Sequence, residues 1–186
     1  MNPRQFVTVL ALLAAVPLAG AALPTQNPFA ARPAKEHALL AKMAGKWTAE
    51  FQLTMPGAPP MASTATEVGE MLGELWLATR YDDPAMMGGA FAGAQLIGYD
   101  PDKKKYVAAW ADSQSASLAL QEGTYDEATR TLTLSGKSVD PMTGTEGTTR
   151  STVRWIDDDH RVHLMFVPGP GGIEMEMFRI DYERAK

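Results

Sequence analysis

Acid–base chemistry in this chain would have to start from its three histidines, His37, His160 and His163. A hydrolytic triad needs a histidine beside a serine or cysteine nucleophile. The chain has no cysteine, and it has no Gly-x-Ser-x-Gly segment that would present a serine on a sharp turn. His163 alternates with the apolar Val162 and Leu164, so we expect its side chain to face solvent. No catalytic residue is therefore predicted.

Metal chemistry is suggested by an acidic run that ends in a histidine and by the eleven methionines. The acidic run, residues 157–160, is contiguous, and neighbouring residues in a turn rarely converge on one ion. Residues 140–144 lack the alternating carboxylates of a calcium loop. Methionine sulfur binds Cu(I), but methionine also fills irregular apolar cores, and we favour that second role. No metal or other cofactor is predicted.

A weaker signal comes from two carboxylates, Asp112 and Glu122, each of which follows alternating apolar residues in an expected strand. If both apolar faces point inward, the carboxylates lie at the end of an apolar cavity. A buried carboxylate must be paired or hydrated, so the two either contact a ligand or anchor the structure, with Arg80 and Arg154 as available partners. The candidate ligand-binding residues are Tyr81, Trp110, Asp112, Leu118, Leu120 and Glu122.

A segment rich in glycine and methionine, residues 83–92, lies between two expected strands. Loops held by a rigid scaffold often carry function, so this segment is a candidate lid over the cavity. Its apolar residues are Met86, Met87 and Phe91. If they are exposed instead, they would form an apolar patch for a protein partner.

Residues 1–21 have the organisation of a secretory signal peptide. A positively charged start precedes an apolar stretch from Phe6 to Leu18 and the small residues Ala19-Gly20-Ala21. The stretch is short for a transmembrane helix, although an uncleaved anchor is an alternative. Residues 22–33 contain three prolines and predict a flexible linker before a folded domain at 34–186. We expect a periplasmic or secreted protein with no membrane span after cleavage.

One helix and about ten strands are expected in the domain. Residues 34–44 place Leu39, Leu40 and Met43 on one helical face, and Gly45 can end that helix. The rest of the domain alternates between short extended runs and turn sequences. The strands are expected at 47–55, 61–72, 75–82, 93–99, 105–112, 116–125, 131–136, 148–156, 160–167 and 173–184.

Short connections decide the fold class. Turn sequences such as residues 100–103 and 168–172 link sequential strands, which favours antiparallel neighbours. No connection is long enough for the helical crossovers of an α/β fold. A ten-stranded meander hides its edges by closing on itself. We predict an all-β, closed, antiparallel up-and-down barrel of lipocalin type with one short N-terminal helix; a two-sheet sandwich is the alternative.

The start of the domain resembles that of lipocalins and other calycins, in which a short helix and a Gly-x-Trp sequence, here Gly45-Lys46-Trp47, lead into the first strand. From about His37 to Arg184 the chain also resembles an uncharacterised bacterial domain-of-unknown-function family placed near the calycins. The stretches that carry this resemblance include AGKWTAEF, GELWLATRYD, LIGYDPDKKKYVAAWADS and EGTYDEATRTLTLSG. The resemblance implies that Trp47 plugs one barrel end and that a basic residue of the last strand packs on its indole, Arg184 before Arg179. It implies no activity.

Composition excludes some functions and leaves others open. The 186-residue chain has a net charge of −5, and its one compact basic run, residues 103–105, lies in an expected turn, so nucleic-acid binding is not predicted. The favoured function is binding of a small apolar or amphipathic ligand inside the barrel. The alternative is a filled barrel that acts through its surface. An enzyme or haem protein is less favoured, because haem would need an inward-facing histidine. No oligomeric state is predicted.

Overall fold

The computed structural model describes residues 30–54, 59–139, 146–169 and 173–186. The expected signal peptide, most of the expected linker and residues 140–144 lie outside the described residues. Residues 33–186 form one unit. Within the part of the chain that is described, no helix is both long and apolar enough to cross a membrane.

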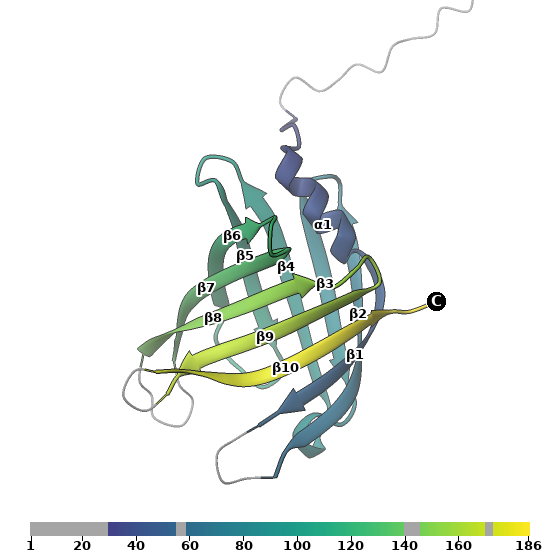
Figure 1. Cartoon of the computed structure of the whole chain (residues 1–186), viewed down its shortest axis with the longest axis vertical. Helices are drawn as coiled ribbons and strands as arrows, with labels where there is room; N and C mark the ends of the chain where they lie inside the picture. Colours follow the sequence, from purple (N-terminus) through teal and green to yellow (C-terminus); the bar gives the residue numbers. More distant parts are fainter. Residues whose placement is uncertain (1–29, 55–58, 140–145, 170–172) are drawn as a thin grey trace, which may run out of the picture. The chain divides into compact units, whose positions relative to one another are not determined.

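The helical segment lies at one end of the barrel (Figure 1). A 3-10 turn, η1 (Lys35–His37), leads directly into helix α1 (Ala38–Met43). The predicted apolar face is buried: Leu39, Leu40 and Met43 pack with inward-facing residues of the strands. The helix therefore covers the barrel end from which the first strand departs.

Ten strands follow, as predicted. They are β1 (Gly45–Leu53), β2 (Met61–Leu72), β3 (Trp76–Asp83), β4 (Phe91–Asp100), β5 (Lys105–Asp112), β6 (Ala119–Asp126), β7 (Thr131–Val139), β8 (Glu146–Trp155), β9 (His160–Pro168) and β10 (Glu174–Arg184). A short 3-10 turn, η2 (Met86–Gly88), lies between β3 and β4.

The strands form a closed antiparallel barrel in chain order, and β10 pairs with β1 to complete it (Figure 1). The closing pairs run from Trp47 opposite Arg184 to Leu53 opposite Phe178. Closure leaves neither of these two strands with an unpaired edge, which is the physical advantage of a barrel over an open meander. The predicted closed antiparallel barrel with one short N-terminal helix is confirmed, and the alternative of a two-sheet sandwich is wrong.

The register of the ladders identifies the inner wall. Residues directly opposite each other in neighbouring strands share a face. One inner row crosses four strands through the buried Ala49, Tyr182, Arg161 and Trp155. Buried apolar residues line the inner wall at the α1 end. At the other end, inward-facing Phe91, Trp110 and Phe178 keep part of their surface exposed.

The register also corrects one expectation about β9. His163 lies opposite the buried Ile180 and Val153, so it faces inward, not toward solvent. The prediction failed because the outer face of β9 is the more apolar one, and Arg150 covers Phe166 there at 4.0 Å from the ring centroid. The inner face carries two polar side chains, so alternation of hydrophobicity points to the wrong face of this strand.

Candidate functional site

Trp47 closes the barrel at the α1 end. Its indole is fully buried, and its Nε1 donates a hydrogen bond to the Met43 carbonyl oxygen at 3.0 Å. The Arg184 guanidinium lies 4.2 Å from the indole centroid, so the contact implied by the resemblance is present. Gly45 has φ of 107°, and a Cβ there would lie 2.9 Å from Nη1 of Arg184. Glycine at this position therefore admits the arginine.

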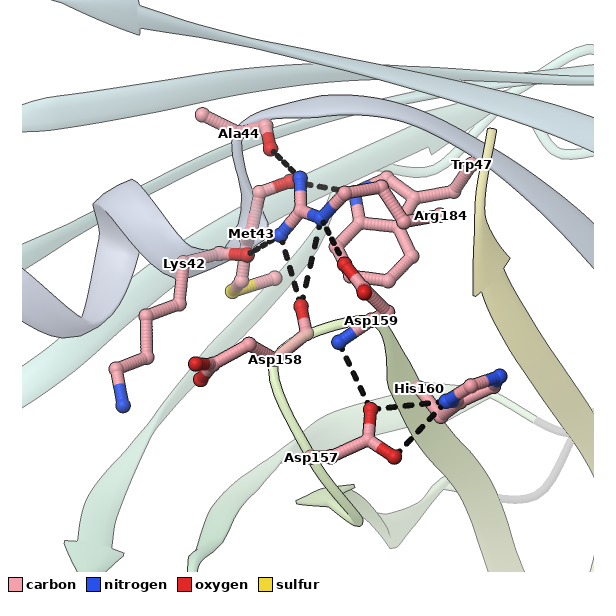
Figure 2. A network of polar contacts seen from close by, with 9 residues as sticks. All are labelled: Lys42, Met43, Ala44, Trp47, Asp157, Asp158, Asp159, His160 and Arg184. Atoms are coloured by element: carbon pink, nitrogen blue, oxygen red, sulfur yellow. Dashed lines mark hydrogen bonds and ion pairs between the residues drawn. The ribbon is translucent and has the colours of Figure 1, made fainter. Parts of the chain in front are cut away.

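All three guanidinium nitrogens of Arg184 donate hydrogen bonds at this closed end, as Figure 2 shows. Its Nη1 donates to the Ala44 carbonyl at 2.9 Å, and its Nη2 donates to the Lys42 carbonyl at 3.0 Å. Nε donates to an Asp159 carboxylate oxygen at 3.2 Å, and the Asp158 carbonyl lies within reach of two of the nitrogens. The arginine thus ties the end of α1 to the β8–β9 turn.

The acidic run considered for metal binding forms this same turn. Asp157 accepts a hydrogen bond from the Asp159 backbone N–H at 2.8 Å, and its carboxylate lies 2.8 Å from Nδ1 of His160 (Figure 2). The backbone hydrogen bond, followed by the His160 contact, lowers the pKa of Asp157. The hydrogen bond from Asp157 raises the pKa of His160. All of these groups are exposed and hold the turn.

A second arginine, Arg161 on β9, also packs on Trp47, but from within the barrel. Its guanidinium lies 4.5 Å from the indole centroid and 4.2 Å from the ring centroid of Tyr182. Arg161 is 2% exposed and forms an ion pair with Glu67 of β2, which is 7% exposed. The Tyr182 hydroxyl donates to the other carboxylate oxygen of Glu67 at 3.1 Å. This group was not predicted from the sequence. The available signal was that Arg161 and His163, two positions apart, lie on the same face of β9.

Four buried polar atoms of the inner wall have no hydrogen-bond partner among the described residues. They are Tyr81 Oη, Trp155 Nε1, Arg161 Nε and His163 Nε2. Trp155 lies directly opposite Arg161, His163 is two residues along β9 on the same face, and Tyr81 lies opposite Glu67. In native structures nearly all buried polar atoms are paired, so four in one region call for an explanation. We refer to these four residues together with Glu67 as the inner polar wall.

The inner polar wall carries little net charge. Burial, followed by the nearby positive charge of Arg161, lowers the pKa of His163 to about 4, so its imidazole is neutral at pH 7. Burial, followed by the Asp83 carboxylate, raises the pKa of Tyr81 above its ordinary value. Burial likewise raises the pKa of Tyr182. The one positive charge, on Arg161, is balanced by Glu67.

Two further residues of the predicted cavity face inward beside Tyr81. Trp110 is half-buried, and its Nε1 donates to a carboxylate oxygen of Asp112 at 3.0 Å. Asp112 also accepts a hydrogen bond from the Gln114 backbone N–H at 2.9 Å. Asp112 therefore has hydrogen-bond partners on its own strand and in the turn that follows. It does not pair with Arg80, which binds Asp82, or with the exposed Arg154.

The other three residues of the predicted cavity are outside it, so that part of the prediction is wrong. Leu118 is 60% exposed and Leu120 is 62% exposed. Leu120 lies opposite Ala109 on the outer wall, and Glu122 pairs there with Lys105 at 2.5 Å. Strand β6 begins at Ala119, and its inward-facing residues are Ala119, Gln121, Gly123 and Tyr125. The glycine and polar residues on this face gave no hydrophobic signal.

The segment proposed as a lid is tied to the barrel at several points. Met86 is buried at 8% exposure, whereas Met87, with φ of 50°, is 57% exposed. Phe91 lies between Tyr81 and Trp110, with ring centroids 6.1 and 6.4 Å away. Two of its three apolar residues therefore belong to the core or its margin. Movement of this segment as a lid stays a prediction.

Two features of the outer wall are separate from the inner polar wall. A hollow of about 570 Å³ lies mainly over outward-facing residues of β1 to β4. Its lining consists of Thr48, Thr64, Ala65, Thr66, Asp82, Asp83, Pro84, Ala90, Phe91, Ala92 and Ser113. None of the four unpaired atoms belongs to it. The second feature is an apolar row across β3 to β6, formed by the exposed Ala78, Leu96 and Leu120 and the half-buried Ala109.

Comparison with known families identifies the chain. The profile of the family described as "Protein of unknown function (DUF1579)" matches residues 32–184. The chain belongs to this family. The match spans α1 and all ten strands of the DUF1579 barrel, which confirms the resemblance to a domain of unknown function.

Among solved structures, the DUF1579 chain is similar to the crystal structure of Rv2717c from M. tuberculosis. The two share 15% sequence identity with a TM-score of 0.62, over 82% of this chain and 99% of that chain. Identity this low shows a shared fold alone. No curated protein sequence matches the DUF1579 chain.

Proposed function

We propose that this protein binds a small amphipathic molecule against the inner polar wall of its barrel. The observation that supports this most directly is the set of four buried polar atoms without partners. Each such atom costs about 1–3 kcal/mol of stability when it is left unpaired. A buried ion pair such as Arg161–Glu67 also stabilises a fold less than apolar residues of equal volume would. A barrel selected for stability alone would not retain this group.

The exposure of side chains at the two barrel ends supports entry of the ligand from the end opposite α1. Around Trp47, at the α1 end, the barrel is closed by buried side chains. At the opposite end, inward-facing Phe91, Trp110 and Phe178 are half-buried and offer aromatic surface to an apolar ligand body. The polar end of the ligand would then lie toward Tyr81 and Arg161.

Export belongs to the same proposal. The pattern of residues 1–21 supports a signal peptide, and residues 22–33 would separate it from the barrel. N-terminal sequencing of the protein from its own cells tests this. We expect a first residue at or just after Ala22. A chain that retains residues 1–21 would contradict export with cleavage.

Native mass spectrometry of the protein purified gently from its own cells tests the binding function. We expect a stoichiometric small molecule that denaturing extraction releases. A bound porphyrin would instead point to His163, whose inward orientation meets the condition for an axial ligand. An unliganded mass would contradict the proposal and favour the alternative, a filled barrel that acts through its surface.

A matched pair of variants localises the site. Glu67→Leu combined with Arg161→Met removes the buried ion pair, and we expect the bound molecule to be lost. Asp82→Leu combined with Arg80→Met removes an ion pair of the same chemistry from the outer wall, where the side chains are 46% and 68% exposed. The double variant of the outer wall should keep the ligand bound. Equal occupancy in both double variants would place the ligand elsewhere.

A further inference from the structure

The charges on the inner wall restrict what a ligand can be. Among the described residues, the inward-facing cations are Arg161, paired with Glu67, and Arg184, committed to Asp159 and the backbone carbonyls of the closed end. His163 is neutral at pH 7. No inward-facing cation is therefore left without a partner in the part of the barrel that is described.

Carboxylates mark the opposite, partly exposed end. Asp83 is 1% exposed and accepts hydrogen bonds from Ser63 Oγ and the Ala85 backbone N–H. Asp112 lies opposite Gly93 on the inner face. An anionic head group that enters from this end would pass two negative charges and meet no free positive charge. Moving a carboxylate into such a site costs far more than moving an uncharged oxygen.

The unpaired atoms are suited to an uncharged oxygen. Arg161 Nε–H and Trp155 Nε1–H are donors with no acceptor, and the Tyr81 hydroxyl both donates and accepts. A carbonyl or hydroxyl oxygen has the lone pairs that these donors lack. The half-buried Phe91, Trp110 and Phe178 would contact the apolar remainder of such a molecule.

We infer that the ligand of the inner polar wall is an uncharged amphipathic molecule whose polar end is a carbonyl or hydroxyl oxygen, and not a fatty acid. This inference rests on the proposed binding function and deepens it. Glu67 is the specificity-determining residue, because it cancels the charge of Arg161. Without that carboxylate, Arg161 would be a buried, unpaired cation, which favours a carboxylate ligand.

Three probes with the same alkyl chain test the inference: 1-dodecanol, methyl dodecanoate and dodecanoate. Binding to the full chain at pH 7.5 is followed by tryptophan fluorescence, and stoichiometry by native mass spectrometry. We expect the native protein to bind the alcohol or the ester at least tenfold more tightly than dodecanoate. Glu67→Gln should shift that ratio at least tenfold toward dodecanoate. Glu70→Gln, the same change at an exposed site on β2, should leave the ratio unchanged.

A second variant keeps the test decisive if Glu67→Gln does not fold. Tyr81→Phe alters no charge, and we expect it to weaken dodecanol severalfold while the protein stays folded. Tighter binding of dodecanoate than of both neutral probes to the native protein would overturn the inference and leave the binding function intact. If none of the three probes binds, and the neutral fluorophore N-phenyl-1-naphthylamine also fails to bind, both the inference and the binding function are overturned.

Discussion

Two arginines pack on the same tryptophan, and their surroundings differ in a way that separates structure from function. Arg184 has an acceptor for each of its three nitrogens and keeps a side-chain exposure of 31%. Arg161 is almost fully buried, has one acidic partner and leaves Nε unpaired. The first arginine completes a closure that needs nothing further. Arg161 belongs to the inner polar wall, where four buried polar atoms have no hydrogen-bond partner among the described residues.

This difference shows how a site can be recognised when no catalytic motif exists. A structural contact satisfies its polar atoms, because each unsatisfied one costs stability. A binding surface leaves donors and acceptors for its ligand. Trp47 marks the boundary between the two situations, since both guanidinium groups contact it.

The largest expected effect comes from breaking the buried ion pair. Glu67→Leu leaves the Arg161 charge buried without a partner, and we expect the free energy of unfolding to fall by about 3–5 kcal/mol. Adding Arg161→Met should restore most of that loss. Asp82→Leu, which breaks an exposed pair, should cost less than about 1 kcal/mol. Urea unfolding followed by tryptophan fluorescence measures all of these variants. Equal losses for Glu67→Leu and Asp82→Leu would contradict the distinction between the two walls.

The next effect is a pH dependence that His163 gives to the inner polar wall. Its folded pKa of about 4 lies below the 6.5 of an ordinary histidine. As pH falls, the unfolded chain therefore takes up this proton first, so the contribution is complete above pH 6.5 and is lost progressively down to pH 4. We expect a loss of about 2–3 kcal/mol over this range. Unfolding titrations of the native protein and His163→Gln give the contribution as their difference.

His160 provides the control for this pH dependence. Its pKa is raised by Asp157, so its contribution has the opposite sign, being present at low pH and lost as pH rises through the folded pKa. Replacing this exposed histidine by glutamine should not remove the destabilisation below pH 6.5. If His160→Gln removed it and His163→Gln did not, the assignment to the inner polar wall would be wrong.

The closed end should respond to the loss of its arginine or its glycine. We expect Arg184→Met to lower the free energy of unfolding by about 2 kcal/mol, because it removes the indole contact and several hydrogen bonds. Gly45→Ala should cost about 1–3 kcal/mol, since alanine is strained at φ of 107° and its Cβ would crowd Arg184. Arg179→Met, which loses only an exposed pair with Asp181, should change stability by less than about 1 kcal/mol. Thermal unfolding of the three variants checks this order.

The smallest and sharpest comparison uses two buried tyrosines. The Tyr106 hydroxyl donates to the Glu36 carbonyl at 2.8 Å, whereas the Tyr81 hydroxyl has no partner. We expect Tyr106→Phe to lower stability by about 1 kcal/mol and Tyr81→Phe to leave it unchanged or raise it. Calorimetry of the ligand-free proteins separates the two. A destabilising Tyr81→Phe would mean that this hydroxyl is already satisfied, and it would weaken the proposed site.

Strand bounds were predicted well from local signals, whereas the inward or outward direction of side chains was predicted less well. The bounds of β5 were predicted to the residue, because alternating apolar residues and the turn before Lys105 are local signals. The contact of Arg184 with Trp47 followed from a resemblance and is present. Leu120 was placed inside the barrel and lies on its outer wall. That error came from the inward face of β6, which has too few large apolar residues to reveal its parity.

The sequence by itself determined the number of strands and their order, since period-two alternation and turn residues act over a few positions. The closure of one barrel end by Trp47 was implied by the family resemblance. Only the tertiary structure decided which face of each strand points inward. It alone brought Glu67 to Arg161, 94 positions apart in the chain. The physical reason is that barrel closure sets the register of every strand at once, so a buried pair between β2 and β9 has no local signature.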